Sequence, residues 1–397
     1  MTVQSNVAAP VGKFEVLNPD EFEVEYVYWI ARSVQSIIKD LAWGAAIPNV
    51  SPKDIEKLEF PIPDRSTQKG IISFLNDLKN NSLEEKNYFS PEIEEKIISA
   101  HQNQVYGGSL SSELTHQLDL VKQLRQAFLR EAMQGKLVPQ SRKLSGPNDE
   151  PASVLLEKIK AEKERLIKEK KIKKQKPLPP ITQDEIPFDI PENWVWCRLG
   201  QVTQSMTNGI YKEDKFYSDD GIGCFRMYNI NDGKINFVKL KRMILTDEEI
   251  ERYLLTQNDL LLNRVNSIEL LGKSGLLPYL DEPFVFESKN IRVILFEKSI
   301  TAPYVNYLFL TSLIKDQILK SFKKVTGQAS ISQEKLNPLL IPFPPLSEQQ
   351  RIVAKLDELM ASCDELEASI KESQQQNEML LQQVLREALE PNTANVA

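Results

Sequence analysis

The chain has 397 residues, of which 41% are hydrophobic and 26% charged, a composition typical of a globular protein with two or three domains. Two histidines and three scattered cysteines argue against a zinc site, a His-dependent triad and a disulfide framework. Apolar runs stay short of membrane-spanning length and the first residues lack a signal-peptide pattern, which predicts a cytoplasmic protein. The net charge of −7 leaves a nucleic-acid partner open, because the placement of charges matters more than their sum.

The first part of the chain alternates between weak and strong patterns. Residues 1–24 are polar and unpatterned, which predicts a flexible leader. From Glu25 to Asp40, apolar residues recur at the spacing of an amphipathic helix. Leu58–Pro63 follows as an extended piece, because its alternating prolines forbid a helix and suit an edge strand. A first long helix is predicted from Ser66 to residue 140, interrupted by a charged loop between Glu84 and His101.

Residues 141–189 form a linker of unusual composition. Within it, Glu157–Lys176 carries ten Lys or Arg and four Glu without apolar periodicity, and prolines end it at Pro177–Pro180. This pattern predicts a solvated, partly helical spacer. A basic arm along DNA phosphates and a linker that is merely soluble fit the composition equally well.

Short apolar runs separated by turn residues mark a different kind of domain between residues 190 and 346. Asn208-Gly209 and Asn231-Asp-Gly233 are two of these turns. We predict an α+β fold class in which this segment is one mixed α/β domain. Its expected elements are strands at 223–228, 234–240, 260–264, 284–286 and 291–296 and a helix at 304–320.

A second long helix is predicted for residues 347–390, followed by a disordered tail at 391–397. Ser347 and Gln350 have the spacing of a capping box at its start. Both long helices carry narrow heptad stripes, which need a facing helix, so we predict an intramolecular antiparallel coiled coil; a helix bundle or an intermolecular coiled coil are alternatives. The stripe residues are Ile71, Leu75, Leu114, Leu118, Val121 and Phe128 in the first helix and Ile352, Leu356, Leu359, Cys363, Leu366, Ile370 and Leu380 in the second.

One passage of the sequence occurs twice. Leu58–Leu75 aligns without gaps on Leu339–Leu356, at a constant offset of 339 − 58 = 281. Each long helix also closes on Leu-Arg-Glu-Ala, at 129–132 and at 385–388. Two related strand-to-helix units are therefore predicted. Residues 25–65 would be a shortened counterpart of the domain at 190–346, because the first half has no counterpart to most of that domain.

These motifs, in this order, resemble the specificity subunit of type I restriction-modification systems. The resemblance extends from about Tyr26 to Glu390 and is specific in the combination of its motifs rather than in any one of them. The motifs are Gln126–Val138 (QAFLREAMQGKLV), Ile190–Trp194 (IPENW), Gly327–Ser332 (GQASIS) and Leu340–Ile352 (LIPFPPLSEQQRI).

The resemblance implies a subunit that recognises DNA without catalytic residues or a cofactor of its own. In this family two target recognition domains each contact half of a split DNA sequence, and a helical pair sets their spacing. A modification subunit that binds S-adenosylmethionine and methylates adenine docks on that pair, and a separate restriction subunit cuts; whether one accompanies this chain is left open. Because the first recognition domain is short here, either one half-site is read or two chains self-associate on an inverted repeat.

Groove chemistry suggests which side chains would contact DNA. Arg and Lys pair with guanine, Asn and Gln with adenine, and Lys or hydroxyl groups with phosphates. Arg226, Arg264 and Gln328 are the strongest candidates, because each follows or interrupts an apolar run that can hold it rigidly. Each candidate also fits a solvated loop residue. The further candidates are Asn208, Tyr211, Lys212, Asn229, Asn263, Asn266, Lys289, Asn290, Lys323 and Lys324.

Parts of the sequence also fit two other classes of function. Asp281 with Glu287 and Lys289 resembles the carboxylates and lysine of a metal-dependent nuclease, a loose pattern that arises often by chance in a chain this charged. A coiled-coil adaptor would use the helices and leave the mixed domain without a DNA task. A Gly-rich phosphate loop and the Asn-Pro-Pro-aromatic motif of amino-methyltransferases are missing from the sequence.

Overall fold

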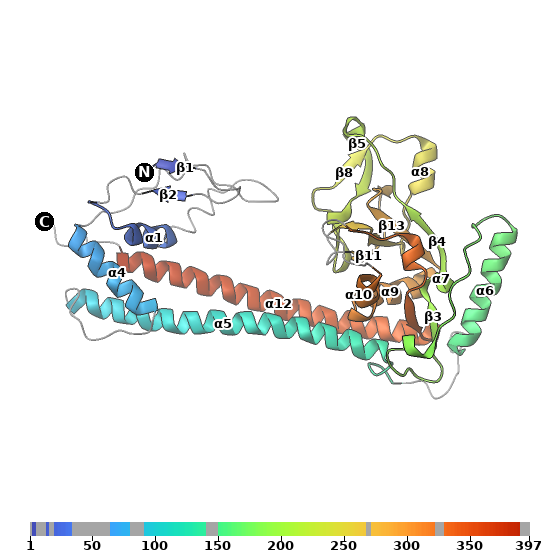
Figure 1. Cartoon of the computed structure of the whole chain (residues 1–397), viewed down its shortest axis with the longest axis horizontal. Coiled ribbons are helices and arrows are strands. Elements are labelled where there is room, and N and C mark those ends of the chain that lie inside the picture. Colours follow the sequence, from blue (N-terminus) through green and yellow to red (C-terminus); the bar gives the residue numbers. More distant parts are fainter. Residues whose placement is uncertain are drawn as a thin grey trace. The chain divides into compact units, whose positions relative to one another are not determined.

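The structure is a computed structural model, and it describes residues 2–4, 13–15, 20–33, 64–79, 91–139, 150–266, 271–321 and 329–389. Two compact units make up the chain, one of Met1–Asp119 with Glu367–Ala397 and one of Leu120–Leu366. The long helices α5 (Pro91–Met133) and α12 (Leu346–Leu389) contribute to both units (Figure 1). Within the described ranges, no helix combines the length and apolar character that a membrane span requires.

In the first unit, two short strands pair with each other and two helices pack together. Strands β1 (Thr2–Gln4) and β2 (Lys13–Glu15) are antiparallel and lie in the segment that we expected to be a flexible leader. Helix α1 (Val24–Ser33) begins where an amphipathic helix was predicted and packs on α4 (Arg65–Lys79). The rest of that prediction, the extended piece at Leu58–Pro63 included, lies outside the described residues.

Helix α4 is anchored at its first turn. The Asp64 carboxylate accepts a hydrogen bond from the Ser66 N–H at 2.9 Å, so the helix begins at Arg65, one residue before the predicted start. The buried Gln68 amide donates to the Glu21 carbonyl at 2.8 Å and accepts from the Glu23 N–H at 2.9 Å. These bonds tie the helix start to the chain that enters α1.

Helix α5 corrects the predicted loop between Glu84 and His101. The helix begins at Pro91, so the described part of that segment is helical. Proline suits this position because a helix start leaves its first N–H groups unbonded in any case. The stretch that precedes Pro91 lies outside the described residues.

A six-stranded sheet organises the second unit. Most of its neighbouring strands are antiparallel, and only β11 and β7 run parallel. All three leucines from Leu260 to Leu262 are buried, because the two faces of β9 serve two different cores. In order, the strands are β4 (Thr203–Asn208), β13 (Asn290–Leu295), β9 (Leu260–Asn263), β11 (Ser274–Leu276), β7 (Gly233–Ile235) and β6 (Ile230–Asn231).

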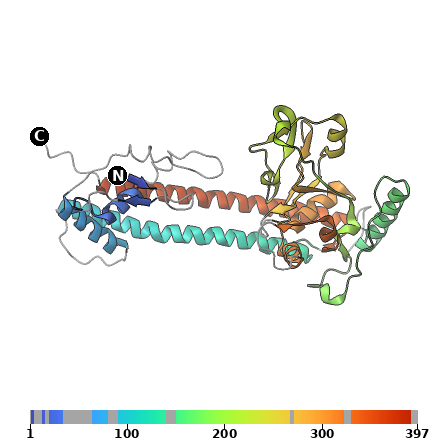
Figure 2. The same ribbon diagram turned by 45° about the horizontal axis from the view of Figure 1, so that its top comes forward.

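A smaller sheet forms a lobe beside the large one (Figures 1 and 2). It consists of β12 (Phe284–Phe286), β5 (Tyr217–Phe225) and β8 (Lys241–Met243). Phe225 stacks on Phe284 with ring centroids 4.8 Å apart, so aromatic packing joins two adjacent strands. Helix α8 (Asp247–Tyr253) packs against β12. These sheets and helices confirm the predicted mixed α/β architecture.

Strand β15 (Leu340–Phe343) joins only β3 (Val195–Arg198), in a separate two-stranded sheet. Pro342 lies within β15, which is possible because each strand of such a sheet has an unpaired side. The buried Tyr304 hydroxyl donates to the Pro342 carbonyl at 2.9 Å. The strand that the repeat predicted before the second long helix is thus confirmed, while the edge strand predicted at Leu58–Pro63 itself stays a prediction.

Helix α12 starts at Leu346, so Ser347 lies inside the first turn and the predicted capping box is wrong. The cause is Pro345, whose carbonyl accepts the first helical N–H bonds from Glu348 and Gln349 at 3.0 and 2.9 Å. The helix predicted at 304–320 is divided into α9 (Lys298–Phe309) and α10 (Ser312–Lys320), and the Thr311 hydroxyl caps the second. Further short elements of this unit are α7 (Leu199–Val202), β10 (Val265–Asn266), β14 (Ala329–Ser330) and α11 (Gln333–Leu336).

The charged linker contains helix α6 (Ala152–Lys168), and the expectation of a solvated spacer is wrong for it. Ala152, Leu155, Ile159 and Leu166 are buried in the large core of the second unit. Half of this stripe precedes the Lys- and Glu-rich stretch and the other half is interspersed with charges, which concealed it in the sequence. The Lys163 ammonium donates to the Gly200 and Thr203 carbonyls at 2.6 and 3.0 Å, and burial lowers its pKa to about 8.

Burial along the long helices follows most of the predicted stripe. Ile352, Leu356, Cys363 and Ile370 are buried in α12, but Leu366 is 48% exposed and does not belong to the stripe. Cys363 and Ile370 are one heptad apart on the buried face of α12, and positions 366 and 367 lie on opposite sides of that face. Packing therefore decides which of the two side chains points inward. Leu114 and Val121 are buried, Ile71, Leu118, Phe128 and Leu359 are partly buried, and the side chains of Leu75 and Leu380 lie outside the described set.

Candidate nucleic-acid interface

Polar residues gather at one end of the six-stranded sheet, where several strands begin or end. Strand β4 ends at Asn208, β9 ends at Asn263 and β13 begins at Asn290. The strand register places Asn208 opposite Ile291 and Asn263 opposite Asn290. The loops at these three strand ends therefore leave the sheet side by side. We call this surface the polar edge; it comprises residues 208–212, 226–229, 263–266 and 287–290.

Buried asparagines hold the loops of the polar edge together. The Asn290 amide donates to the Phe225 carbonyl at 3.3 Å, and the Asn263 amide donates to the Met227 carbonyl at 3.2 Å. The Asn229 amide donates to two carbonyls of the neighbouring turn, at 3.1 and 3.0 Å. These three asparagines are at most 1% exposed. They were predicted to contact DNA, but the structure places them beneath the surface as supports for the turn at 226–229.

The loop after β4 lies directly against the chain after β12. The Ile210 N–H donates to the Phe286 carbonyl at 2.9 Å, and the Ser288 N–H donates to the Ile210 carbonyl at 2.8 Å. A Cβ at Gly209 would come within 2.2 Å of the Phe286 carbonyl, so only glycine allows this approach. Beyond it, Tyr211 is 78% exposed at the surface of the polar edge.

Three more of the predicted contacts lie at this surface, two of them exposed and one in a salt bridge. Asn208 and Lys289 are exposed. Lys212 is held at 2.6 Å from the Glu249 carboxylate, and this partner lowers the pKa of Glu249. The Lys212 ammonium is therefore already engaged by a carboxylate and is not counted among the proposed DNA contacts.

Arg264 is bound through its backbone on both sides. Its N–H donates to the Lys289 carbonyl at 2.8 Å, and its carbonyl accepts from the Ile331 N–H at 2.9 Å. Its side chain is half-buried, with Nη1 3.4 Å from the Ser288 carbonyl. The side chain of Asn266 and all of Lys323, Lys324 and Gln328 lie outside the described residues.

Arg226 forms the main ion pair of the polar edge. Its Nε donates to Glu287 Oε2 at 2.8 Å, while Glu287 Oε1 accepts from the Met227 N–H at 3.1 Å. The guanidinium carbon lies 5.9 and 5.6 Å from the rings of Tyr217 and Tyr228. Burial lowers the pKa of Arg226, but the hydrogen bond and charge of Glu287 outweigh it and raise the pKa overall.

Glu287 is the residue whose role sequence reasoning missed. It was singled out as a metal ligand, yet both of its oxygens are occupied by Arg226 and Met227 and its side chain is 8% exposed. Asp281 and Glu287 also lie on opposite ends of β12, which separates the two carboxylates proposed for a nuclease. Within the part of the chain that the structure covers, no group of three His, Cys, Asp or Glu side chains could hold a metal ion.

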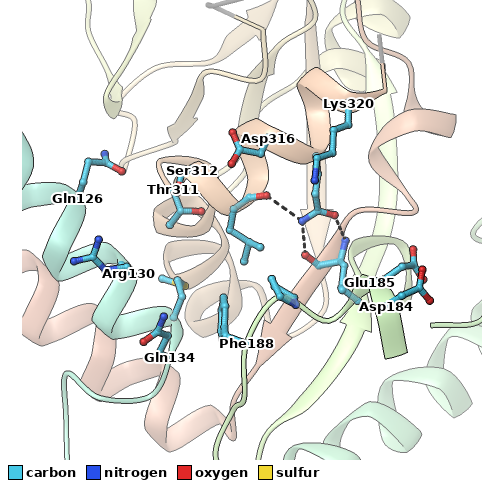
Figure 3. Close-up of a pocket in the computed structure, with 15 residues that line it drawn as sticks. Gln126, Arg130, Gln134, Asp184, Glu185, Phe188, Thr311, Ser312, Asp316 and Lys320 are labelled. Carbon is cyan, nitrogen blue, oxygen red and sulfur yellow. Dashed lines mark hydrogen bonds between the residues drawn. The ribbon is translucent and has the colours of Figure 1, made fainter. Parts of the chain in front are cut away.

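A cavity of about 520 Å³ lies in the second unit and shares no lining residue with the polar edge (Figure 3). The end of α5 contributes Gln126, Arg130 and Gln134, so one face of the QAFLREAMQGKLV motif forms a cavity wall. Facing them are Asp316 and Lys320 of α10. The cavity therefore carries groups of both charges and is bounded by segments far apart in the sequence.

Comparisons with known proteins identify the family. The family described as "Type I restriction modification DNA specificity domain" matches residues 3–90 and 191–374. The specificity subunit of the type I restriction enzyme EcoAI from Escherichia coli is 37% identical over 265 residues, covering 64% of this chain and 42% of that subunit. The EcoEI specificity subunit from Escherichia coli is 26% identical over 399 residues, covering 94% of this chain and 65% of that subunit.

One solved structure also matches most of the chain. The HsdS subunit from Thermoanaerobacter tengcongensis matches 94% of this chain and 71% of its own length, with 16% identity and a TM-score of 0.37. The chain spans 42% and 65% of the lengths of the two curated relatives above. The family match, in contrast, covers more than half of the chain and includes the polar edge. The resemblance found in the sequence motifs is confirmed, and the chain belongs to the family of type I restriction-modification DNA specificity proteins.

Proposed function

We propose that this chain is the sequence-recognition subunit of a type I restriction-modification methyltransferase, with the polar edge as its DNA surface and no catalytic role of its own. The observation that carries the proposal is the convergence of four polar segments from distant parts of the sequence on one sheet edge. Buried asparagines hold these segments beneath the surface. A rigid platform of this kind lowers the entropy that side chains lose when they bind bases.

The proposed contacts fall into two groups. Asn208, Tyr211, Arg226, Arg264 and Lys289 reach the surface of the polar edge and are the proposed DNA contacts within the described residues. Asn266, Lys323, Lys324 and Gln328 stay proposed contacts, because Asn266 ends β10 and the other three precede β14 in the sequence, and β10 and β14 pair next to Arg264. Asn229, Asn263 and Asn290 have the supporting role described above.

The long helices are the proposed docking site for the modification subunit, as an antiparallel coiled coil. One contact in each unit supports this arrangement. Gln374 donates to the Thr115 hydroxyl at 3.4 Å, and Arg125 lies 2.7 Å from Asp364. A step of ten residues along α5 is matched by a step of ten residues backwards along α12 (125 − 115 = 374 − 364). Constant opposite steps are what an antiparallel pair in fixed register produces.

The partners follow from this assignment. The modification subunit would bind S-adenosylmethionine and methylate adenine, and a restriction subunit would join where the system cuts DNA. Residues 25–65 would form a shortened recognition domain, an assignment supported by α4 and α12, which begin 346 − 65 = 281 residues apart, as the sequence repeat does. Either one half-site is read, or two chains pair and read an inverted repeat.

Selection from a random duplex DNA library tests the proposal. The full-length chain, co-expressed with the modification subunit, should enrich a defined sequence, and its affinity should fall steeply between about 50 and about 200 mM salt, because phosphate contacts release counterions. The native mass of the complex gives the number of chains. Enrichment of no sequence, with binding to the modification subunit intact, would instead favour a coiled-coil adaptor. Methylation or cleavage of DNA by the chain alone would contradict the non-catalytic role.

A further inference from the structure

The guanidinium of Arg226 is anchored on one side and open on the other. Nε is paired with Glu287 at 2.8 Å. Among the residues that the structure describes, none accepts a hydrogen bond from the two terminal amino groups, Nη1 and Nη2. The side chain is 30% exposed, so these groups face the solvent of the polar edge. Nη1 and Nη2 together form a fork that can donate two parallel hydrogen bonds. This fork is therefore available to a ligand.

The other arginines between residues 190 and 346, all of which the structure describes, are used differently. Arg242 gives both terminal amino groups to Glu282, at 3.1 and 2.5 Å. Arg292 donates Nη1 to the Leu254 carbonyl at 2.6 Å, and Arg198 is buried among four acceptor residues. Arg264 donates Nη1 to the Ser288 carbonyl at 3.4 Å, and the Arg252 guanidinium lies over the ring of Tyr253. In this domain an ionic anchor on Nε combined with a free fork occurs at Arg226.

The anchor is itself rigid. Glu287 uses its second oxygen to accept from the Met227 N–H at 3.1 Å, and its N–H donates to the Phe225 carbonyl at 3.0 Å. Tyr217 and Tyr228 confine the guanidinium from two ring faces. A planar cation held in this way loses little conformational entropy when its fork binds a planar acceptor.

Guanine is the base that suits such a fork. In the major groove it presents two adjacent acceptors, O6 and N7, which a terminal pair of Arg N–H groups binds in bidentate fashion. A phosphate also accepts two such bonds, but it carries no sequence information. Because Glu287 fixes Arg226 on a platform at the end of a sheet, the structure favours the base.

We infer that Arg226 recognises a guanine of the target sequence through Nη1 and Nη2, and that Glu287 is the positioning residue that aims it. The inference rests on the proposed function and assigns one base of the target DNA to one residue. The two residues form a specificity-determining pair, and they lie 61 residues apart in the sequence.

The main test replaces Arg226→Lys, which keeps the cation and a hydrogen bond to Glu287 but removes the fork. Full-length chain with the co-expressed modification subunit is used to select from a random duplex library. The wild type should enrich guanine at one position that the variant no longer specifies, while the other positions stay the same. Affinity for the wild-type sequence should fall roughly 5- to 150-fold.

Two further variants test the positioning role of Glu287. Glu287→Ala should lose guanine preference at the same position, and Glu287→Gln, which still accepts from Nε, should recover much of it. In the Arg226→Lys background neither change should alter base preference further, because Glu287 acts through Arg226. Melting temperature, measured for every variant, separates this effect from a loss of folding. Arg242→Lys is the matched control, since Glu282 occupies its fork, and it should leave the selected sequence unchanged.

The outcomes separate the two proposals. If Arg226→Lys still selects guanine at every wild-type position, the inference is wrong while the proposed function stands. A uniform loss of affinity for all sequences would identify Arg226 as a phosphate contact and also overturn the inference. If the wild-type complex selects no sequence at all, it is the proposed function that fails.

Discussion

At the residue scale, the structure assigns buried amides a role that matches the sequence repeat. Gln68 and Gln349 occupy the same place in the two copies, 349 − 68 = 281 residues apart, and both are completely buried at a helix start. Gln68 binds the backbone at Glu21 and Glu23, and Gln349 donates to the Pro344 carbonyl at 2.8 Å. Each amide pairs a backbone group next to a helix start, that of α1 for Gln68 and that of α12 for Gln349.

Replacing Gln349→Leu should lower the free energy of unfolding by ~1–3 kcal/mol, because the Pro344 carbonyl would lose its buried partner. Urea unfolding followed by tryptophan fluorescence measures the change. The adjacent Gln350 is exposed, so Gln350→Leu is a matched control that should stay within about 0.5 kcal/mol of the wild type. Equal effects of the two substitutions would contradict the role of the buried amide.

The three cysteines are buried thiols and should resist thiol reagents. Burial raises the pKa of Cys224 to about 12 and also raises the pKa of Cys197, which keeps both thiols protonated at neutral pH. Because the thiolate is the reactive form, native protein should not react with Ellman's reagent on the timescale of minutes. Denatured protein should release three equivalents of the coloured thiolate. Rapid reaction of the native protein would show that the cysteines are accessible.

At the element scale, helix α6 shows how tertiary packing overrides composition. The Lys- and Glu-rich stretch is typical of a solvated spacer, yet Leu155, Ile159 and Leu166 pack into the large core. Charged residues cover the outer face over several turns, while one apolar residue per turn or two is enough to bind the inner face to the core. Heptad position 366 on α12 illustrates the same dependence, because the direction of packing decides its exposure.

Replacing Ile159→Ala should destabilise the second unit by about 2–5 kcal/mol, since the residue is buried in the same core as Trp194. Val154→Ala on the exposed side of α6 is the control and should change stability by less than about 0.5 kcal/mol. Thermal or urea unfolding followed by tryptophan fluorescence distinguishes them. If α6 were a solvated spacer, both substitutions would have the same small effect.

At the scale of the whole molecule, the proposed antiparallel coiled coil is the feature that would connect recognition to the partner subunit. Its register can be tested with Thr115→Cys and Gln374→Cys in one chain, because these residues are in contact. A short bismaleimide should link the two helices within one chain and leave the molecular mass that of a monomer. A dimer on a denaturing gel would favour the intermolecular coiled coil instead.

A displaced pair is the control for this cross-link. Thr115→Cys combined with Glu358→Cys places the second cysteine 374 − 358 = 16 residues before position 374 in α12, a displacement of about 24 Å at the rise of an α-helix. This pair should not react with the same short reagent within one chain. Cross-linking of both pairs with equal yield would exclude a fixed register.

The polar edge separates what local pattern can predict from what it cannot. Turn residues such as Asn208, Arg226 and Lys289 were found because polar groups at the ends of apolar runs are a local signal, and the structure brings them together at the polar edge. Their neighbours Asn229, Asn263 and Asn290 carry the same signal but are buried beneath it. Glu287 was noticed for the wrong reason, since the partner that defines its role is far away in sequence.

By itself the sequence determined the family, the mixed α/β architecture and the repeated junction from extended chain to helix, because motifs, periodicity and prolines act over a few consecutive residues. Only the tertiary structure decided that α6 packs on the core, that Leu366 turns outward and that three asparagines support the surface rather than form it. It also decided that Glu287 holds Arg226 and leaves its fork open. These properties depend on which distant segments pack against a residue, and burial of a polar or apolar group is set by those neighbours rather than by its own type.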